Sequence, residues 1–280
     1  MKKIGIYGAG VMGSGIAYAF ASGGYPVIQF SLFENELETS MENHKRLLKR
    51  EVEKGRKTKE DSEHVLSLIT PSFEVSSLKD CDLIVEAVLE DVNIKKKVFQ
   101  ELSDIVSSTC VVATNTSTIS ITELASSYKN SDKCIGMHFM NPVPKMKLVE
   151  VISGLQTSSL TVDQVVSLTL QIGKEPVVVK DSPGFVLNRI LIPLINEGIM
   201  CLEEGVGDAE SIDKMMILGA NHPMGPLALA DLVGLDVCLH IMEVLYKDFG
   251  DSKYRPSPLL RRMVSAGKLG RKTKQGFYLY

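Results

Sequence analysis

The sequence lacks the features that mark several classes of protein. It has no tryptophan, and its five cysteines are scattered along 280 residues without a CxxC pair. This spacing excludes a disulfide framework and the usual zinc sites, so we expect no metal and a cytoplasmic location. No apolar run approaches the roughly 18 residues that cross a bilayer, so we expect no membrane association. A net charge of -3 offers no broad basic surface, and we expect no nucleic-acid partner.

The hydrophobic pattern divides the chain into two parts. The first alternates short apolar strands with helices, which predicts an α/β domain of the Rossmann type, with a doubly wound, mostly parallel sheet. The pattern after Asp181-Ser182-Pro183-Gly184 is helical throughout. We therefore expect a dinucleotide-binding domain over residues 1–183 and an all-α domain over residues 184–280. Strands are predicted at 3–8, 27–30, 82–86, 110–114, 134–138, 148–152 and 176–179, and helices at 11–22, 35–54, 92–106, 162–173, 185–204, 208–219, 226–248 and 257–266.

A glycine-rich turn follows the first predicted strand. Its GxGxxG pattern consists of Gly8, Gly10, Val11, Met12 and Gly13, with Ala9 between the first two glycines. The first glycine permits the tight turn, the second lets the backbone approach a pyrophosphate, and the third lets the helix pack closely on the sheet. The helix N-terminus then faces the phosphates. The position favours a dinucleotide site over a purely structural turn.

The end of the second predicted strand bears on the choice of cofactor. An acidic residue usually stands there and binds the ribose hydroxyls of NAD, but this chain has Ser31. A serine can bind a ribose but does not repel a 2′-phosphate, and no arginine adjoins it to hold one. We expect NAD as cofactor, leave NADP open, and predict relaxed selectivity between the two.

Two polar side chains stand out on apolar strands. His138 ends a predicted strand, at the edge of an α/β sheet where ligands bind. Glu150 interrupts the run Leu148-Val149-Glu150-Val151, where a buried carboxylate needs a partner. A His–Glu pair meets that need and is typical of general acid–base catalysis. A core histidine with satisfied hydrogen bonds is the alternative.

Residues 45–59 form a basic segment. They contain eight Lys and Arg against two Glu, and several of the basic residues recur at helical spacing. This pattern fits either a solvated helix face with Glu–Lys pairs or a site that attracts a polyanionic ligand.

Taken together, long segments of the chain resemble the 3-hydroxyacyl-CoA dehydrogenase family. They include GAGVMGSGIAYAFA, DLIVEAVLED, ATNTSTISITELA, IGMHFMNPVPKMKLVEV, DSPGFVLNRILIPLINE, GANHPMGPLALADLVGLDV and LGRKTKQGFY. Several long motifs in the right order are more specific than any one alone. At this length the chain is most similar to bacterial members that act on 3-hydroxybutyryl-CoA. The resemblance implies an enzyme that interconverts (S)-3-hydroxyacyl-CoA and 3-ketoacyl-CoA, here short-chain ones such as acetoacetyl-CoA, with a nicotinamide cofactor.

The resemblance also implies roles for individual residues. His138 matches the catalytic histidine and Glu150 its paired glutamate. Ser117 matches the serine that contacts the substrate's 3-oxygen and the cofactor, and Asn188 the asparagine that positions the substrate carbonyl. The residues matching cofactor contacts are Glu90, Lys95, Asn115, Asn141 and Lys272, and those matching the basic residues for CoA phosphates are Arg50 and Lys54.

Other interpretations of the sequence remain open, and some residues depart from the family pattern. A 3-hydroxyacid dehydrogenase that acts on a free acid, a relative without activity and a dinucleotide sensor share parts of the pattern. Ser31, Met140, Lys145 and Lys274 depart from the family's usual residues. The predicted helices from about 185 to 248 are apolar over more than one face, which predicts a homodimer.

Overall fold

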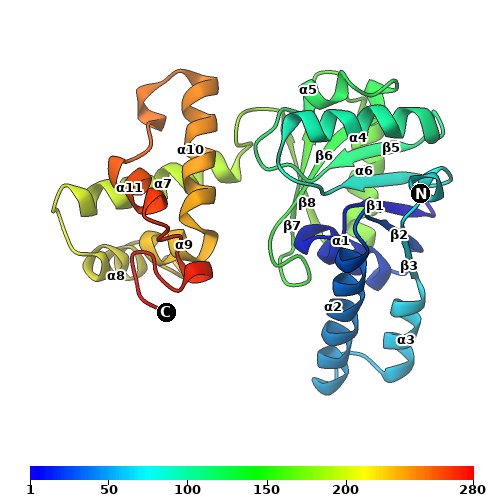
Figure 1. The fold of residues 1–280 in the computed structure, drawn as a ribbon, viewed down its shortest axis with the longest axis horizontal. Coiled ribbons are helices and arrows are strands. Elements are labelled where there is room, and N and C mark those ends of the chain that lie inside the picture. The colour runs from blue at the N-terminus through cyan, green and yellow to red at the C-terminus, as the bar shows by residue number, and fades with distance from the viewer. The chain divides into compact units, whose positions relative to one another are not determined.

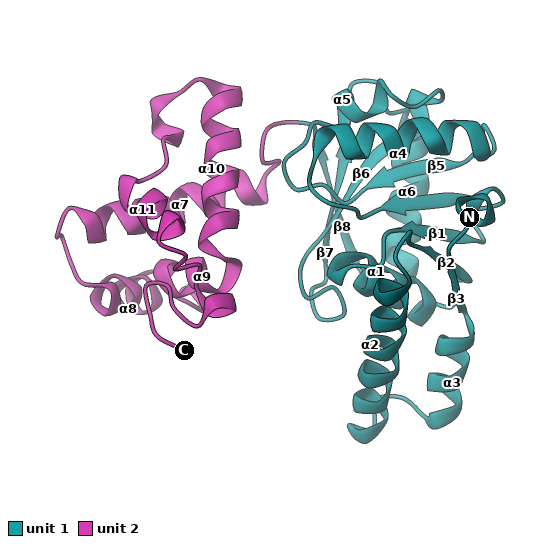
Figure 2. Ribbon diagram, viewed as in Figure 1, with its two compact units in different colours: residues 1–181 teal, residues 182–280 magenta.

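The computed structural model describes all 280 residues as two compact units (Figure 2). Unit 1 comprises residues 1–181 and contains every strand of the sheet, whereas unit 2 comprises residues 182–280 and is helical. The two expected fold types are thus present. None of the helices combines the length and the apolar character needed to span a membrane.

Unit 1 is built on an eight-stranded sheet in the order β3-β2-β1-β4-β5-β6-β7-β8 (Figure 1). The strands from β3 to β6 are parallel, β7 runs antiparallel to β6, and β8 is parallel to β7. The single reversal between β6 and β7 interrupts an otherwise parallel sheet. The strands are β1 (Ile4–Tyr7), β2 (Val27–Phe30), β3 (Ile69–Ser72), β4 (Leu83–Glu86), β5 (Val111–Thr114), β6 (Cys134–Phe139), β7 (Leu148–Ser153) and β8 (Glu175–Lys180).

Helices cover the sheet and bury its apolar side chains. One large core cluster joins alternate residues of the strands to apolar residues of α1 and α6, as expected where helices pack on a parallel sheet. Short 3-10 turns cover Val75–Leu78 and Ser131–Lys133. The helices of unit 1 are α1 (Val11–Ser22), α2 (Glu34–Glu53), α3 (Lys59–Ser67), α4 (Val92–Ile105), α5 (Ile121–Ala125) and α6 (Ser159–Gln171).

Three elements of unit 1 are absent from the sequence-based prediction. Helix α3 is nine residues long and has one buried residue, Val65, so its apolar period is weak. Its readable signal is the capping box of Thr58 and Asp61, whose side chains each accept the other's backbone N–H. Strand β3 contains Pro71 and lies at the sheet edge, where proline is tolerated. Helix α5 has only five residues.

Unit 2 is a bundle of five helices with its own core (Figure 1). One expectation fails here: residues 226–248 do not form a single helix. The chain breaks at Gly234, whose φ of 103° lies outside the region that a helix or an L side chain adopts. The helices are α7 (Leu187–Glu203), α8 (Ala209–Ala220), α9 (Pro226–Val233), α10 (Leu235–Phe249) and α11 (Pro258–Ser265), with short 3-10 turns at Ser252–Tyr254 and Arg271–Thr273.

Candidate active site

The glycine turn fits a dinucleotide pyrophosphate. A Cβ on Gly8 would lie 2.7 Å from the Ala87 carbonyl oxygen, and one on Gly13 would lie 2.2 Å from the Gly8 carbonyl oxygen, so the turn is close-packed at both positions. Gly10 has nothing within 4 Å of an added Cβ and is the N-cap of α1 without a capping side chain. The first N–H groups of α1 therefore remain available to bind phosphate oxygens.

Ser31 lies just beyond β2, beside this turn. It is buried, with 4% of its surface exposed, and its Oγ donates a hydrogen bond to Glu36 Oε2 at 2.8 Å. The Phe33 amide donates to Ser31 Oγ at 3.2 Å. The Ser31 hydroxyl therefore already makes hydrogen bonds within the chain. The Glu36 carboxylate lies beside Ser31, which occupies the position where an acidic residue usually stands.

His138 and Glu150 occupy directly opposed positions on the antiparallel strands β6 and β7. Nδ1 of His138 lies 2.8 Å from Glu150 Oε2, and both side chains are buried. Because an ionised carboxylate only accepts hydrogen bonds, Nδ1 is the protonated nitrogen of this contact. The other ring nitrogen, Nε2, is then left to exchange a proton with a reacting group.

Ser117 completes this row of polar groups. Its Oγ lies 3.0 Å from Nε2 of His138. Ser117 belongs to the loop that follows β5, so two strand ends deliver its hydroxyl and the imidazole to one edge of the sheet. A carboxylate, an imidazole and a hydroxyl in sequence form a chain of groups that can move a proton.

Glu90 organises the loop that carries Ser117. Its Oε1 accepts hydrogen bonds from the amides of Ser117 (2.8 Å) and Thr118 (3.0 Å) and from the hydroxyl of Thr116 (2.5 Å). Burial by itself would raise the pKa of Glu90, but Lys95 and these hydrogen bonds together hold it below the usual value. The carboxylate therefore stays ionised at neutral pH.

A buried ion network lies beneath this loop. The Lys95 side chain is 1% exposed, and its ammonium group contacts Glu86 Oε1 at 2.7 Å and lies 3.4 Å from Glu90 Oε2. Thr114 Oγ1 donates to the other oxygen of Glu86 at 2.7 Å. Lys95, expected to line the cofactor site, thus reaches the loop through Glu90.

The expected asparagines lie on the loops at the same edge. Asn115 Oδ1 accepts the amide of Phe139 at 2.9 Å and so ties the end of β5 to the end of β6. Asn141 is exposed and lies two residues after the end of β6. The turn that follows it is held by Lys174, whose ammonium group donates to the carbonyls of Val143 and Met146.

Other expected residues lie elsewhere in the chain. Asn188 is the second residue of α7 and is 9% exposed, within unit 2. Lys272, also in unit 2, pairs with both carboxylate oxygens of Asp236. Arg50 lies in the last turn of α2 and Lys54 follows as its C-cap, and both are exposed.

Two carboxylates at this edge of the sheet were not predicted from the sequence. Glu86 ends the apolar run Leu83-Ile84-Val85 and is fully buried, and a charged residue in that position is a readable signal. Glu36 gives no such signal, because it lies among polar residues at the start of α2.

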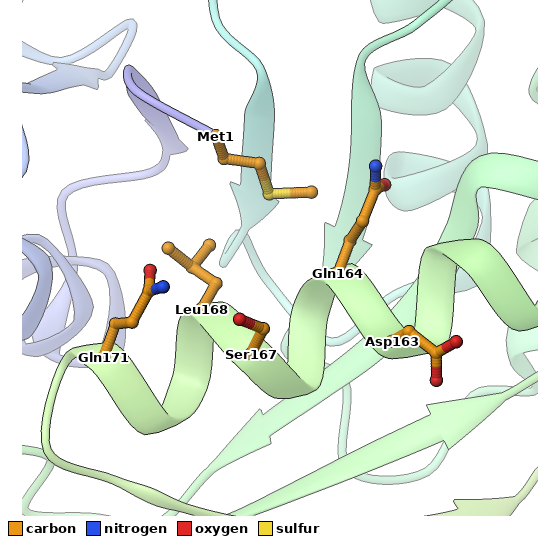
Figure 3. Close-up of a pocket in the computed structure, with 6 residues that line it drawn as sticks. All are labelled: Met1, Asp163, Gln164, Ser167, Leu168 and Gln171. Atoms are coloured by element: carbon orange, nitrogen blue, oxygen red, sulfur yellow. The ribbon is translucent and has the colours of Figure 1, made fainter.

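A hollow of about 290 Å³ lies apart from these groups (Figure 3). Side chains of α6 and Met1 line it, and Asp163 is its only ionisable side chain. No histidine, cysteine, lysine or arginine side chain lines it. The lining residues are Met1, Asp163, Gln164, Ser167, Leu168 and Gln171.

Comparison with known families agrees with the geometry. Residues 3–182 match the NAD binding domain of 3-hydroxyacyl-CoA dehydrogenase, and residues 184–280 match the C-terminal domain of the same family. The two matches together cover nearly the whole chain.

Individual relatives are similar over their full length. The chain is 53% identical to the 3-hydroxybutyryl-CoA dehydrogenase of Clostridioides difficile, covering 99% of each chain, and 48% identical to a probable 3-hydroxybutyryl-CoA dehydrogenase of Bacillus subtilis, covering 100% and 98%. Among solved structures, the (S)-3-hydroxybutyryl-CoA dehydrogenase of Ralstonia eutropha superimposes with a TM-score of 0.98 at 47% identity, covering 100% and 99%. The chain thus belongs to the 3-hydroxyacyl-CoA dehydrogenase family and is an NAD-dependent oxidoreductase.

Proposed function

We propose that the protein interconverts (S)-3-hydroxybutyryl-CoA and acetoacetyl-CoA. The observation that carries the proposal is the Glu150–His138–Ser117 row at the edge of the sheet, with contacts of 2.8 and 3.0 Å. The relatives of similar length, which are named for 3-hydroxybutyryl-CoA, support the short-chain substrate. When bound, NAD supplies the hydride acceptor, and NADH the donor.

The chain's own residues handle the proton. In oxidation, Nε2 of His138 takes the proton of the 3-hydroxyl group, and in reduction the imidazolium returns a proton to the 3-keto oxygen. Glu150 holds the ring through Nδ1 and stabilises the imidazolium by its negative charge.

Ser117 and Asn188 position the substrate oxygens by hydrogen bonding, and such donors stabilise charge that develops on a carbonyl oxygen. The contact of Ser117 with His138 supports its share in this role. For Asn188 the support is the match of PGFVLNR to the family motif.

The CoA phosphates bind the basic segment of α2 and the turn after it. Three lysines or arginines there form ion pairs, Lys49 with Glu53, Arg56 with Glu51 and Lys59 with Glu63. Arg50 and Lys54 are among the basic residues of the segment that make no ion pair, and both are exposed. Two unpaired cations about one helical turn apart suit a polyanionic nucleotide.

The protein works as a homodimer in the cytoplasm. Large apolar side chains exposed on unit 2 support a partner surface there; they include Ile190, Val206, Met215 and Leu218, between 65% and 73% exposed. Single, widely spaced cysteines support a reducing compartment. Sedimentation at micromolar concentration that gives a monomer would contradict the dimer.

One assay tests the substrate assignment. The oxidation of NADH is followed with acetoacetyl-CoA, with free acetoacetate and with a long-chain 3-ketoacyl-CoA. The proposal expects turnover with acetoacetyl-CoA at the highest kcat/KM. Faster turnover of free acetoacetate would favour a free-acid dehydrogenase, and a preference for the long chain would overturn the short-chain assignment.

A further inference from the structure

We propose that Glu36 selects NAD over NADP. In this chain the carboxylate that binds the adenosine ribose comes from the first turn of α2, because the end of β2 carries Ser31. This inference rests on the NAD site of the family and not on the identity of the acyl substrate.

The position of Glu36 is fixed by contacts beside the glycine turn. The amide of Gly8 donates to the Phe30 carbonyl at 2.8 Å, so the end of β2 is bound directly to the first glycine. Ser31 follows, and its hydroxyl donates to Glu36 Oε2 at 2.8 Å. The serine therefore holds the carboxylate at the strand end instead of replacing it.

The second oxygen of Glu36 remains available. Oε2 is bound to Ser31, whereas Oε1 has no hydrogen-bond or ion-pair partner within the chain, and the side chain is half-buried. A held carboxylate with an unused oxygen can accept hydrogen bonds from the two ribose hydroxyls. Ser31 alone, whose hydroxyl hydrogen is directed at Glu36, offers no negatively charged hydrogen-bond acceptor to the ribose.

The surroundings are unsuited to a 2′-phosphate. Phe30 of β2 pairs with Ser72 of β3, so the two strand ends lie side by side. Neither residues 31–36 nor residues 72–78 contain a lysine or arginine. A 2′-phosphate would meet the Glu36 carboxylate without a compensating cation, and like charges at short range repel. The relaxed selectivity expected from Ser31 alone is therefore replaced by selectivity for NAD.

The experiment measures cofactor binding without acyl substrate. NADH and NADPH are titrated separately into wild type and into Glu36→Gln, and binding is followed by nicotinamide fluorescence. We expect wild type to bind NADH at least about tenfold more tightly than NADPH, the range for one charged hydrogen bond. Glu36→Gln keeps the shape, weakens NADH and tightens NADPH, so that the ratio falls about tenfold.

The matched control is Glu38→Gln, which removes the same charge from the same helix at an exposed position about 200° around its axis. It should leave the ratio unchanged. Ser31→Ala, which frees the carboxylate, should lower the ratio less than Glu36→Gln does. Equal affinity of wild type for both cofactors, or an equal change of both in Glu36→Gln, would overturn the inference. A selective protein without turnover of acetoacetyl-CoA would refute the proposed substrate and leave this inference standing.

Discussion

Glu90 accepts a hydrogen bond from the backbone amide of Ser117, whose hydroxyl contacts the ring of His138. The same oxygen of Glu90 also binds Thr116 and Thr118. One carboxylate, anchored by the buried Lys95, therefore sets the conformation of the loop that presents Ser117. Glu90 is thus a positioning residue for Ser117.

Replacing Glu90 should lower turnover through Ser117. Glu90→Gln retains an oxygen but loses the charge that pairs with Lys95, so the loop shifts, and small misplacements cost up to about 100-fold in rate. We expect kcat to fall by about 10- to 100-fold with a smaller change in KM. Adding Ser117→Ala should then cost little more, because both changes remove one function. The control is Glu123→Gln, an exposed partner of Lys96. Fully additive losses would contradict the positioning role.

His138→Ala tests the acid–base role. Losing a general acid–base costs about 10²- to 10⁴-fold, so we expect kcat to fall in that range. The affinity for NADH should hardly change, since the glycine turn lies on other elements. His64→Ala, an exposed position on α3, serves as the control. Near-normal turnover of His138→Ala would refute the role.

Glu150→Gln tests the charge beside the imidazole. The amide keeps the shape but no longer stabilises the protonated ring, which the reductive direction requires. The rate of acetoacetyl-CoA reduction should therefore decline at a lower pH than in wild type, while oxidation, which needs the neutral ring, is spared over more of the range. Superimposable pH–rate profiles would show that the carboxylate charge plays no part.

Arg50→Ala combined with Lys54→Ala tests the binding of the CoA phosphates. We expect a raised KM for acetoacetyl-CoA and an unchanged KM for acetoacetyl-pantetheine, which lacks the nucleotide. Exposed charges are screened over about 8 Å at physiological salt, so salt should raise KM in wild type and have less effect on the double variant. Lys49→Ala with Lys59→Ala, which removes two cations already paired with glutamates, is the control. If KM for both substrates depended equally on salt concentration, Arg50 and Lys54 would be solvated surface residues without a role in CoA binding.

His44 predicts how the stability of unit 1 depends on pH. The ring is fully buried, its Nε2 contacts Ser14, and its Nδ1 has no partner. Desolvation therefore lowers its pKa, although the Ser14 carbonyl opposes the shift. The unfolded chain then binds more protons below about pH 6.5, so stability is complete above that pH and declines below it. Between pH 7.5 and 5.5 the Tm of wild type should fall more steeply than the Tm of His44→Gln. Parallel dependence of the two Tm values on pH would contradict this role of His44.

The sequence was most informative where residues break a pattern. GxGxxG after a strand, a histidine at a strand end and a glutamate inside an apolar run can each be recognised from the sequence alone. The pairing of His138 with Glu150 depends on the reversal of β7, which period-two patterns do not encode because they are the same in both directions.

Other parts depended on three-dimensional context. Glu36 meets Ser31 only because the first turn of α2 brings its side chain back to the strand end. Helix α3 contributes one buried residue, so its sequence contains no apolar stripe that would predict a helix. The break at Gly234 was missed because glycine is tolerated within a helical pattern, and only its backbone angle reveals the corner.

The opposed positions of His138 and Glu150 on a hydrogen-bonded ladder have a consequence for robustness. Their contact is set by backbone register, and a slip of one residue would turn Glu150 to the other face of the sheet. Local fraying of loops leaves such a pair intact, whereas opening the β6–β7 ladder destroys it. The pair is therefore tied to the cooperative unfolding of the sheet, and denaturant should abolish the His–Glu contact together with the fold rather than before it.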